Sequence, residues 1–178
     1  MLSAVNNKKY IISFMVLLLS SFAVNFCNQI YQCAFFFTLV MSTSWLISKD
    51  YGQKNAFITL FLALFISGAL TMNLNYTIHG KVYNGIVMAS LLSAFVSFVV
   101  ASLIFNRKNN YKVLPVLITA AILDGAIMSS YFSNKITLEN VSVILAQELF
   151  FKAIYSGLAL MVINSMQHNH NSEEVITN

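Results

Sequence analysis

The sequence predicts an all-α membrane protein, a polytopic bundle of six transmembrane helices with both termini in the cytoplasm. Of its 178 residues, 58% are hydrophobic and only 9% are charged, and the mean hydropathy is +0.72. A soluble domain carries about 25% charged residues, so this chain has too few to cover a water-exposed surface. The bilayer is therefore the expected solvent for most of the chain.

Six apolar runs follow one another along the chain. Each is about 17 to 23 residues long, close to the ~20 residues that cross a ~30 Å hydrocarbon core. Lipid cannot satisfy an open backbone, and the runs lack the polar alternation of membrane strands, so helices are expected. The runs are residues 10–26, 30–47, 56–72, 85–105, 112–132 and 141–163.

The first run also fits a secretory signal peptide, because Lys8 and Lys9 precede it and small residues lie near its end. The next segment is a second membrane run rather than a soluble domain, which favours a retained first helix. The two cysteines, Cys27 and Cys33, lie in or beside apolar runs. Without further metal ligands nearby, they predict neither a disulfide framework nor a metal site.

The basic residues predict the orientation, because cytoplasmic loops of membrane proteins carry an excess of lysine and arginine. The loops after the third and fifth runs have only Lys81 and Lys135. The opposite side, with both termini, is therefore expected to face the cytoplasm. Its seven basic residues are Lys8, Lys9, Lys49, Lys54, Arg107, Lys108 and Lys112.

The chain is expected to form one six-helix transmembrane domain, residues 1–163, and a polar cytoplasmic tail without fixed structure, residues 164–178. The longest connection, NLNYTIHGKVYNG at residues 73–85, is interpreted as a surface loop, with a lid over a pocket as the alternative. No phosphate-binding loop or catalytic motif is present. We therefore expect no enzymatic activity, no cofactor and no metal, and the net charge of +4 does not indicate a nucleic-acid partner.

Three ionisable residues lie inside the apolar runs, namely Asp124 in the fifth run and Glu148 and Lys152 in the sixth. At 1.5 Å per residue, Asp124 lies about 18 Å from one membrane edge and Lys152 about 16 to 17 Å from the other. Both are therefore expected near the midplane, on antiparallel neighbours. Glu148 and Lys152 are four residues apart, so they share one helix face.

A charge at the bilayer centre costs at least ~2.5–3.5 kcal/mol on insertion scales, so these residues are expected to face the bundle interior. Two interpretations stay open. One is an ion-pair cluster that only fixes helix packing, and the other is a polar site for a solute or a proton. Tyr131 continues the face of Asp124, and Tyr155 continues the face of Lys152. A stripe on the fourth run is interpreted as close helix packing: Ser90, Ser93 and Ser97.

Three segments of the chain carry a family resemblance. SKDYGQKNAF, residues 48–57, follows the second run, and RKNNYKVLPVLITAAILDG, residues 107–125, ends on Asp124 and Gly125. QELFFKAIYSG in the last run contains Lys152. Together they resemble the VUT-type queuosine-precursor transporters, six-helix bacterial membrane proteins with an acidic-YG-x-K-x-A element, an aspartate in the fifth helix and a lysine in the last. The resemblance covers roughly residues 32–163.

The resemblance implies import of a 7-deazaguanine, such as 7-cyano-7-deazaguanine, for queuosine in tRNA. Asp124 would accept hydrogen bonds from N–H groups of the solute, Lys152 would balance its charge, and a tyrosine would stack on the ring. The chain departs from the family pattern at Ala120 and Ala121, where the family has Ser and Gln. The predicted substrate-binding residues are Asp124, Lys152, Glu148, Tyr131 and Tyr155.

Two alternatives to an independent transporter remain at this point. The resemblance also extends to the substrate-binding subunits of energy-coupling-factor vitamin transporters, which need an ATPase module. The other alternative is a non-transporting membrane scaffold protein. The expected partners are a small-molecule substrate and the lipid bilayer, and a homo-oligomer or an ATPase module stays open.

Overall fold

The computed structural model describes residues 2–27, 29–74, 76–78, 81–83, 85–106, 112–133 and 137–176. Within them the chain forms long helices, one short 3-10 turn at Val24–Phe26 and a two-stranded antiparallel hairpin, β1 (Tyr76–Ile78) and β2 (Lys81–Tyr83). The helices are α1 (Leu2–Ala23), α2 (Ile30–Tyr51), α3 (Gln53–Thr71), α4 (Ile86–Asn106), α5 (Val113–Ser133) and α6 (Leu138–Ile176).

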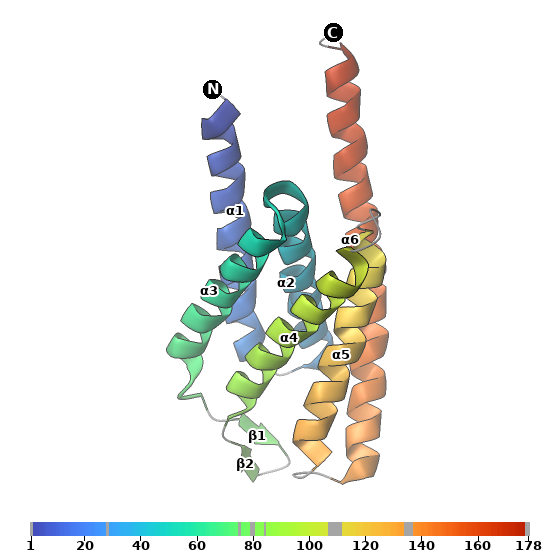
Figure 1. The fold of residues 1–178 in the computed structure, drawn as a ribbon. Coiled ribbons are helices and arrows are strands. Elements are labelled where there is room, and N and C mark those ends of the chain that lie inside the picture. Colours follow the sequence, from blue (N-terminus) through green and yellow to red (C-terminus); the bar gives the residue numbers. More distant parts are fainter. Residues whose placement is uncertain are drawn as a thin grey trace.

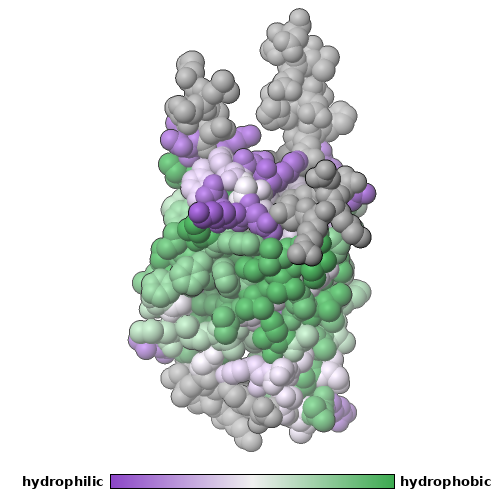
Figure 2. Space-filling view, viewed as in Figure 1, coloured by the Kyte–Doolittle hydropathy of each residue, from purple (hydrophilic) through white to green (hydrophobic). Residues whose placement is uncertain are grey.

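All six of these helices are long and apolar enough to cross a membrane, counted over the described residues. Figure 2 shows a hydrophobic belt around the middle of the bundle and hydrophilic residues at the end where both termini lie. This arrangement matches a multi-pass membrane protein, because lipid-facing surface must be apolar and the polar residues must reach the headgroups. The predicted fold class, an all-α bundle of six transmembrane helices, is confirmed.

The helix α2 lies at the centre of the bundle and packs against α1, α3, α5 and α6, with a smaller contact to α4 (Figure 1). Its buried residues include Ala34, Met41 and Ile47, whereas α6 at the periphery exposes Phe150 and Met161. The start of α1 and the end of α6 lie at one end of the bundle, here called the terminal end, and the β-hairpin lies at the other, the hairpin end (Figure 1).

The corner between α2 and α3 is tighter than the sequence predicted. Residues 48–55 were expected as a loop, but α2 continues to Tyr51 and α3 starts at Gln53. Gly52 alone makes the connection, with φ +90°, a backbone conformation that residues other than glycine rarely adopt. The SKDYGQKNAF segment is therefore a helix–glycine–helix corner.

Two further segments differ from the sequence expectation. The tail from residue 164 was expected without fixed structure, but α6 continues as a helix to Ile176. The connection between α3 and α4, interpreted as a surface loop, contains the β1–β2 hairpin, whose register pairs Tyr76 with Tyr83. The side chains of this hairpin, and those of Arg107, Lys108, Lys135, His168 and His170, lie outside the described residues, so a lid stays a prediction.

Candidate functional site

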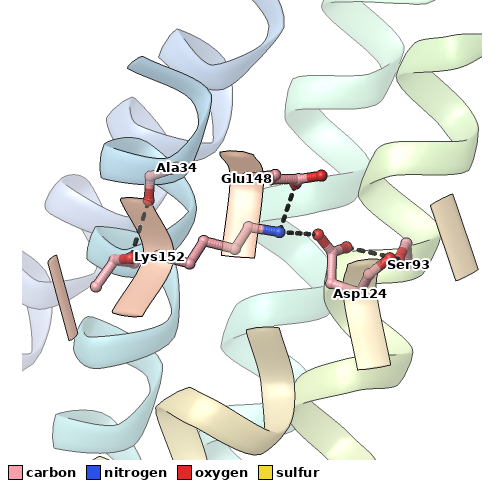
Figure 3. Close-up of polar contacts among 6 residues, drawn as sticks. Ala34, Ser93, Asp124, Glu148 and Lys152 are labelled. Carbon is pink, nitrogen blue, oxygen red and sulfur yellow. Dashed lines mark hydrogen bonds and ion pairs between the residues drawn. The ribbon is translucent and has the colours of Figure 1, made fainter. Parts of the chain in front are cut away.

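A cluster of charged and polar side chains lies between α4, α5 and α6. The Lys152 Nζ atom is 2.5 Å from Asp124 Oδ2 and 2.5 Å from Glu148 Oε1. The Ser93 hydroxyl donates a hydrogen bond of 2.5 Å to Asp124 Oδ1 (Figure 3). We call Ser93, Asp124, Glu148 and Lys152 the charged cluster. The expected match in depth between Asp124 and Lys152 is thereby confirmed.

The charged cluster is buried, but its members differ in exposure. The side chains of Lys152 and Asp124 are 1% and 6% exposed, whereas that of Glu148 is 19% exposed. Ser93 is fully buried. Two carboxylates share one ammonium group, so the cluster carries one excess negative charge when every group is ionised. An excess charge inside a membrane bundle is costly, which makes the cluster an acceptor for a cation, a proton or N–H donors.

Lys152 has a third contact, on the side of α2. Its Nζ atom lies 3.9 Å from the centroid of the Phe37 ring, a distance typical of a cation–π contact. The lysine is therefore held between two carboxylates and an aromatic face. This surrounding fixes the ammonium group in place and excludes water from it.

Close packing of α5 on α6 brings Asp124 and Lys152 together. A Cβ atom on Gly125 would lie 2.7 Å from Leu145 Cδ1, so the absence of a side chain there lets the two helices approach beside Asp124. Ala120 and Ala121, one turn away, are also buried and small. These small side chains add to the close packing next to the aspartate.

The two predicted tyrosines have contacts with residues outside the charged cluster. A Cβ atom on Gly85 would lie 3.7 Å from the Tyr131 hydroxyl, which places that hydroxyl beside the start of α4. Tyr155 packs edge-on against Phe35, with ring centroids 5.5 Å apart, in a groove between α2 and α6. Of the five predicted binding residues, the structure brings together Asp124, Glu148 and Lys152, and a role for the tyrosines stays a prediction.

Ser93 is the member of the cluster that sequence reasoning missed. The stripe at 90, 93 and 97 was interpreted as packing, and Ser97 is indeed fully buried. Ser93, however, donates to both the carboxylate and the main-chain carbonyl of Asp124. The signal that pointed to it was a serine on an otherwise apolar helix, but sequence alone did not show which way α4 is turned.

A groove at the hairpin end reaches the neighbourhood of Glu148. It has a volume of about 500 Å³, and its lining includes Gln29 and Tyr31 from the start of α2 and Gln147 from α6. Gln147 precedes Glu148 in the chain. Glu148 also lies within electrostatic range of Cys33, in the first turn of α2. Glu148 thus directly follows a residue that lines this groove, and it is bound to Lys152.

A second buried polar cluster lies between α1 and α3 and contains no charge. The Asn25 side-chain amide donates to the Ser67 and Thr71 hydroxyls, at 2.8 and 3.0 Å, and to the carbonyl of Ser21. The Ser67 hydroxyl donates to the same carbonyl. We call Ser21, Asn25, Ser67 and Thr71 the amide–hydroxyl cluster. It joins two helices through neutral hydrogen bonds.

Comparisons with known proteins leave the family open. No family model matches the chain, and neither a curated protein nor a solved structure matches it. The resemblance to the VUT-type transporters therefore rests on the three segments described above.

Proposed function

We propose that this chain is a bacterial inner-membrane transporter that imports a small nitrogenous solute through the charged cluster. The substrate class we favour is a 7-deazapurine such as 7-cyano-7-deazaguanine. The observation that carries the proposal is a buried lysine shared by two carboxylates inside a membrane bundle. Its excess negative charge suits a solute rich in N–H donors, because a carboxylate accepts hydrogen bonds from such an edge.

The main alternative is a scaffold protein in which the ion pair only fixes packing. The amide–hydroxyl cluster argues against this alternative, because it shows that the bundle joins two helices with neutral groups. Charged groups are costlier to insert than amides and hydroxyls. Retaining three of them at one place is better explained by a task that needs charge.

The test uses a bacterial host that lacks both queuosine-precursor synthesis and its own precursor transporter. The host is fed a low concentration of 7-cyano-7-deazaguanine, with and without this chain, and tRNA queuosine is measured. We expect the chain to restore queuosine. No restoration, with the protein present in the membrane, would contradict this substrate or point to a missing ATPase module.

The variant Asp124→Asn separates transporter from scaffold in the same assay. The amide keeps the shape and can still accept from Ser93, but it loses the charge. A charge-assisted hydrogen bond is worth about 1.5–3 kcal/mol, so we expect queuosine formation to fall by about tenfold or more. The exposed Glu139→Gln variant on α6 is the control. A scaffold would tolerate both changes equally.

A further inference from the structure

We infer that Glu148 is the proton-exchanging group of the charged cluster, so that a neutral solute enters together with one proton. This inference rests on the proposed function and adds the coupling ion to it. It follows from two differences between Glu148 and Asp124, which lie at the same distance from the same lysine, and from the charge balance of the cluster.

The first difference is the number of bonds that hold each carboxylate. Asp124 has one oxygen on Lys152 and the other on Ser93. Glu148 is bound to Lys152, and the described residues provide it with no hydrogen bond comparable to that from Ser93. Asp124 is therefore fixed on both oxygens, whereas Glu148 can leave the lysine by breaking one contact.

The second difference is access. Glu148 is 19% exposed, about three times as much as Asp124 at 6%. Its chain neighbour Gln147 lines the groove at the hairpin end, and Gln147 and Gln29 supply polar groups that water can bind there. We therefore place the proton path to Glu148 on the side of this groove.

The third argument is charge balance. The titratable groups that face Glu148 are Lys152 on its own helix, Asp124 on α5 and the Cys33 thiol on α2. With the thiol neutral, the two carboxylates and the ammonium leave one negative charge. A proton on Glu148 makes the cluster neutral and leaves the Lys152–Asp124 pair intact. A neutral cluster costs least to seal away from water, so solute occlusion is expected to require the proton.

The first test needs no solute. Infrared difference spectra of the purified full-length protein between acidic and alkaline pH should contain the C=O band of one buried protonated carboxyl group. We expect Glu148→Gln to remove this band and the exposed control Glu139→Gln to keep it. Asp124→Asn leaves a neutral pair of Lys152 and Glu148, so the band should then appear only at lower pH. Glu148→Asp, which retains an acid, should shift the band. Loss of the band in Asp124→Asn alone, or its absence from the unsubstituted protein, would overturn the inference.

The second test uses proteoliposomes and 7-cyano-7-deazaguanine. One proton per solute corresponds to about tenfold accumulation per pH unit across the membrane. We expect Glu148→Gln to show no accumulation of solute above the outside concentration, whatever the pH gradient, whereas the exposed control Glu139→Gln should keep both counterflow and accumulation. Because the proton carries charge, an inside-negative membrane potential should also drive accumulation. Accumulation that responds to the potential but not to the pH gradient would overturn proton coupling and indicate another cationic co-substrate. Absence of counterflow in the unsubstituted protein would refute the proposed function, while the infrared test still decides the proton site.

Discussion

The charged cluster and the amide–hydroxyl cluster both consist of buried polar groups in one bundle, but these groups differ in their bonding partners. In the amide–hydroxyl cluster, the Ser67 and Thr71 hydroxyls also donate to main-chain carbonyls at Ser21 and Ser67. In the charged cluster, Lys152 depends on side chains from two helices. Neutral groups are thus sufficient for hydrogen bonds between helices in this bundle. Helix packing therefore does not require the charges of the charged cluster.

The largest expected effect comes from Lys152→Met, which leaves two carboxylates without their counter-charge. An unpaired charge inside a membrane bundle costs about 3 kcal/mol, so the free energy of unfolding in detergent should fall by about that amount at neutral pH. The exposed Lys112→Met variant at the start of α5 is the control and should change it by less than about 0.5 kcal/mol. Equal effects of both variants would contradict the role of Lys152 as the counter-charge of the charged cluster.

An intermediate effect is expected from Asn25→Ala in the amide–hydroxyl cluster. Interhelical hydrogen bonds in membranes average about 0.6 kcal/mol, and Ser67 and Thr71 keep their main-chain acceptors, so the loss should be about 1–2 kcal/mol. Uptake per folded molecule should not change. Asn55→Ala, which removes an exposed bond to the carbonyl of Tyr51, is the matched control. Lost uptake by a folded Asn25→Ala protein would assign this cluster to transport as well.

The smallest effect is expected from Gly125→Ala, which tests the spacing of α5 and α6. The new Cβ atom would displace the flexible Leu145 side chain, so we expect a loss of at most about 1 kcal/mol. Gly157→Ala on α6 meets no atom within 4 Å and should be neutral or slightly stabilising. The two unfolding free energies are compared in detergent, and a greater loss at Gly157 would contradict the close approach beside Asp124.

The fold was largely predictable because each apolar run is as long as a bilayer is thick. The boundaries of the helices were less predictable. The charges of Lys49, Asp50 and Lys54 indicated a loop, but Gly52 alone reverses the chain, and the flanking polar residues stay helical. Polar composition likewise predicted an unstructured tail after residue 163, although the sequence contains no proline or glycine there to end α6.

The candidate site was predictable where spacing along one helix determined it. Glu148 and Lys152 share a face by their spacing of four residues, and depth alone placed Asp124 opposite them. The contribution of Ser93 depends on the rotation of α4 against α5, which no local pattern encodes. Tyr155 lies only three residues from Lys152, yet its ring turns toward Phe35, because side-chain direction is decided by packing across helices.

The pairing of Lys152 with Asp124 also bears on how the protein is made. Helix α5 leaves the ribosome before α6 and contains a carboxylate whose counter-charge, among the described residues, lies on α6. The hydroxyls of Thr38, Ser42 and Ser44 on α2 bond to carbonyls of their own helix, so α2 carries these groups into lipid already satisfied. We therefore expect α2 to be released into the membrane early, and α5 to wait at the insertion channel and enter the bilayer together with α6 as a helical hairpin.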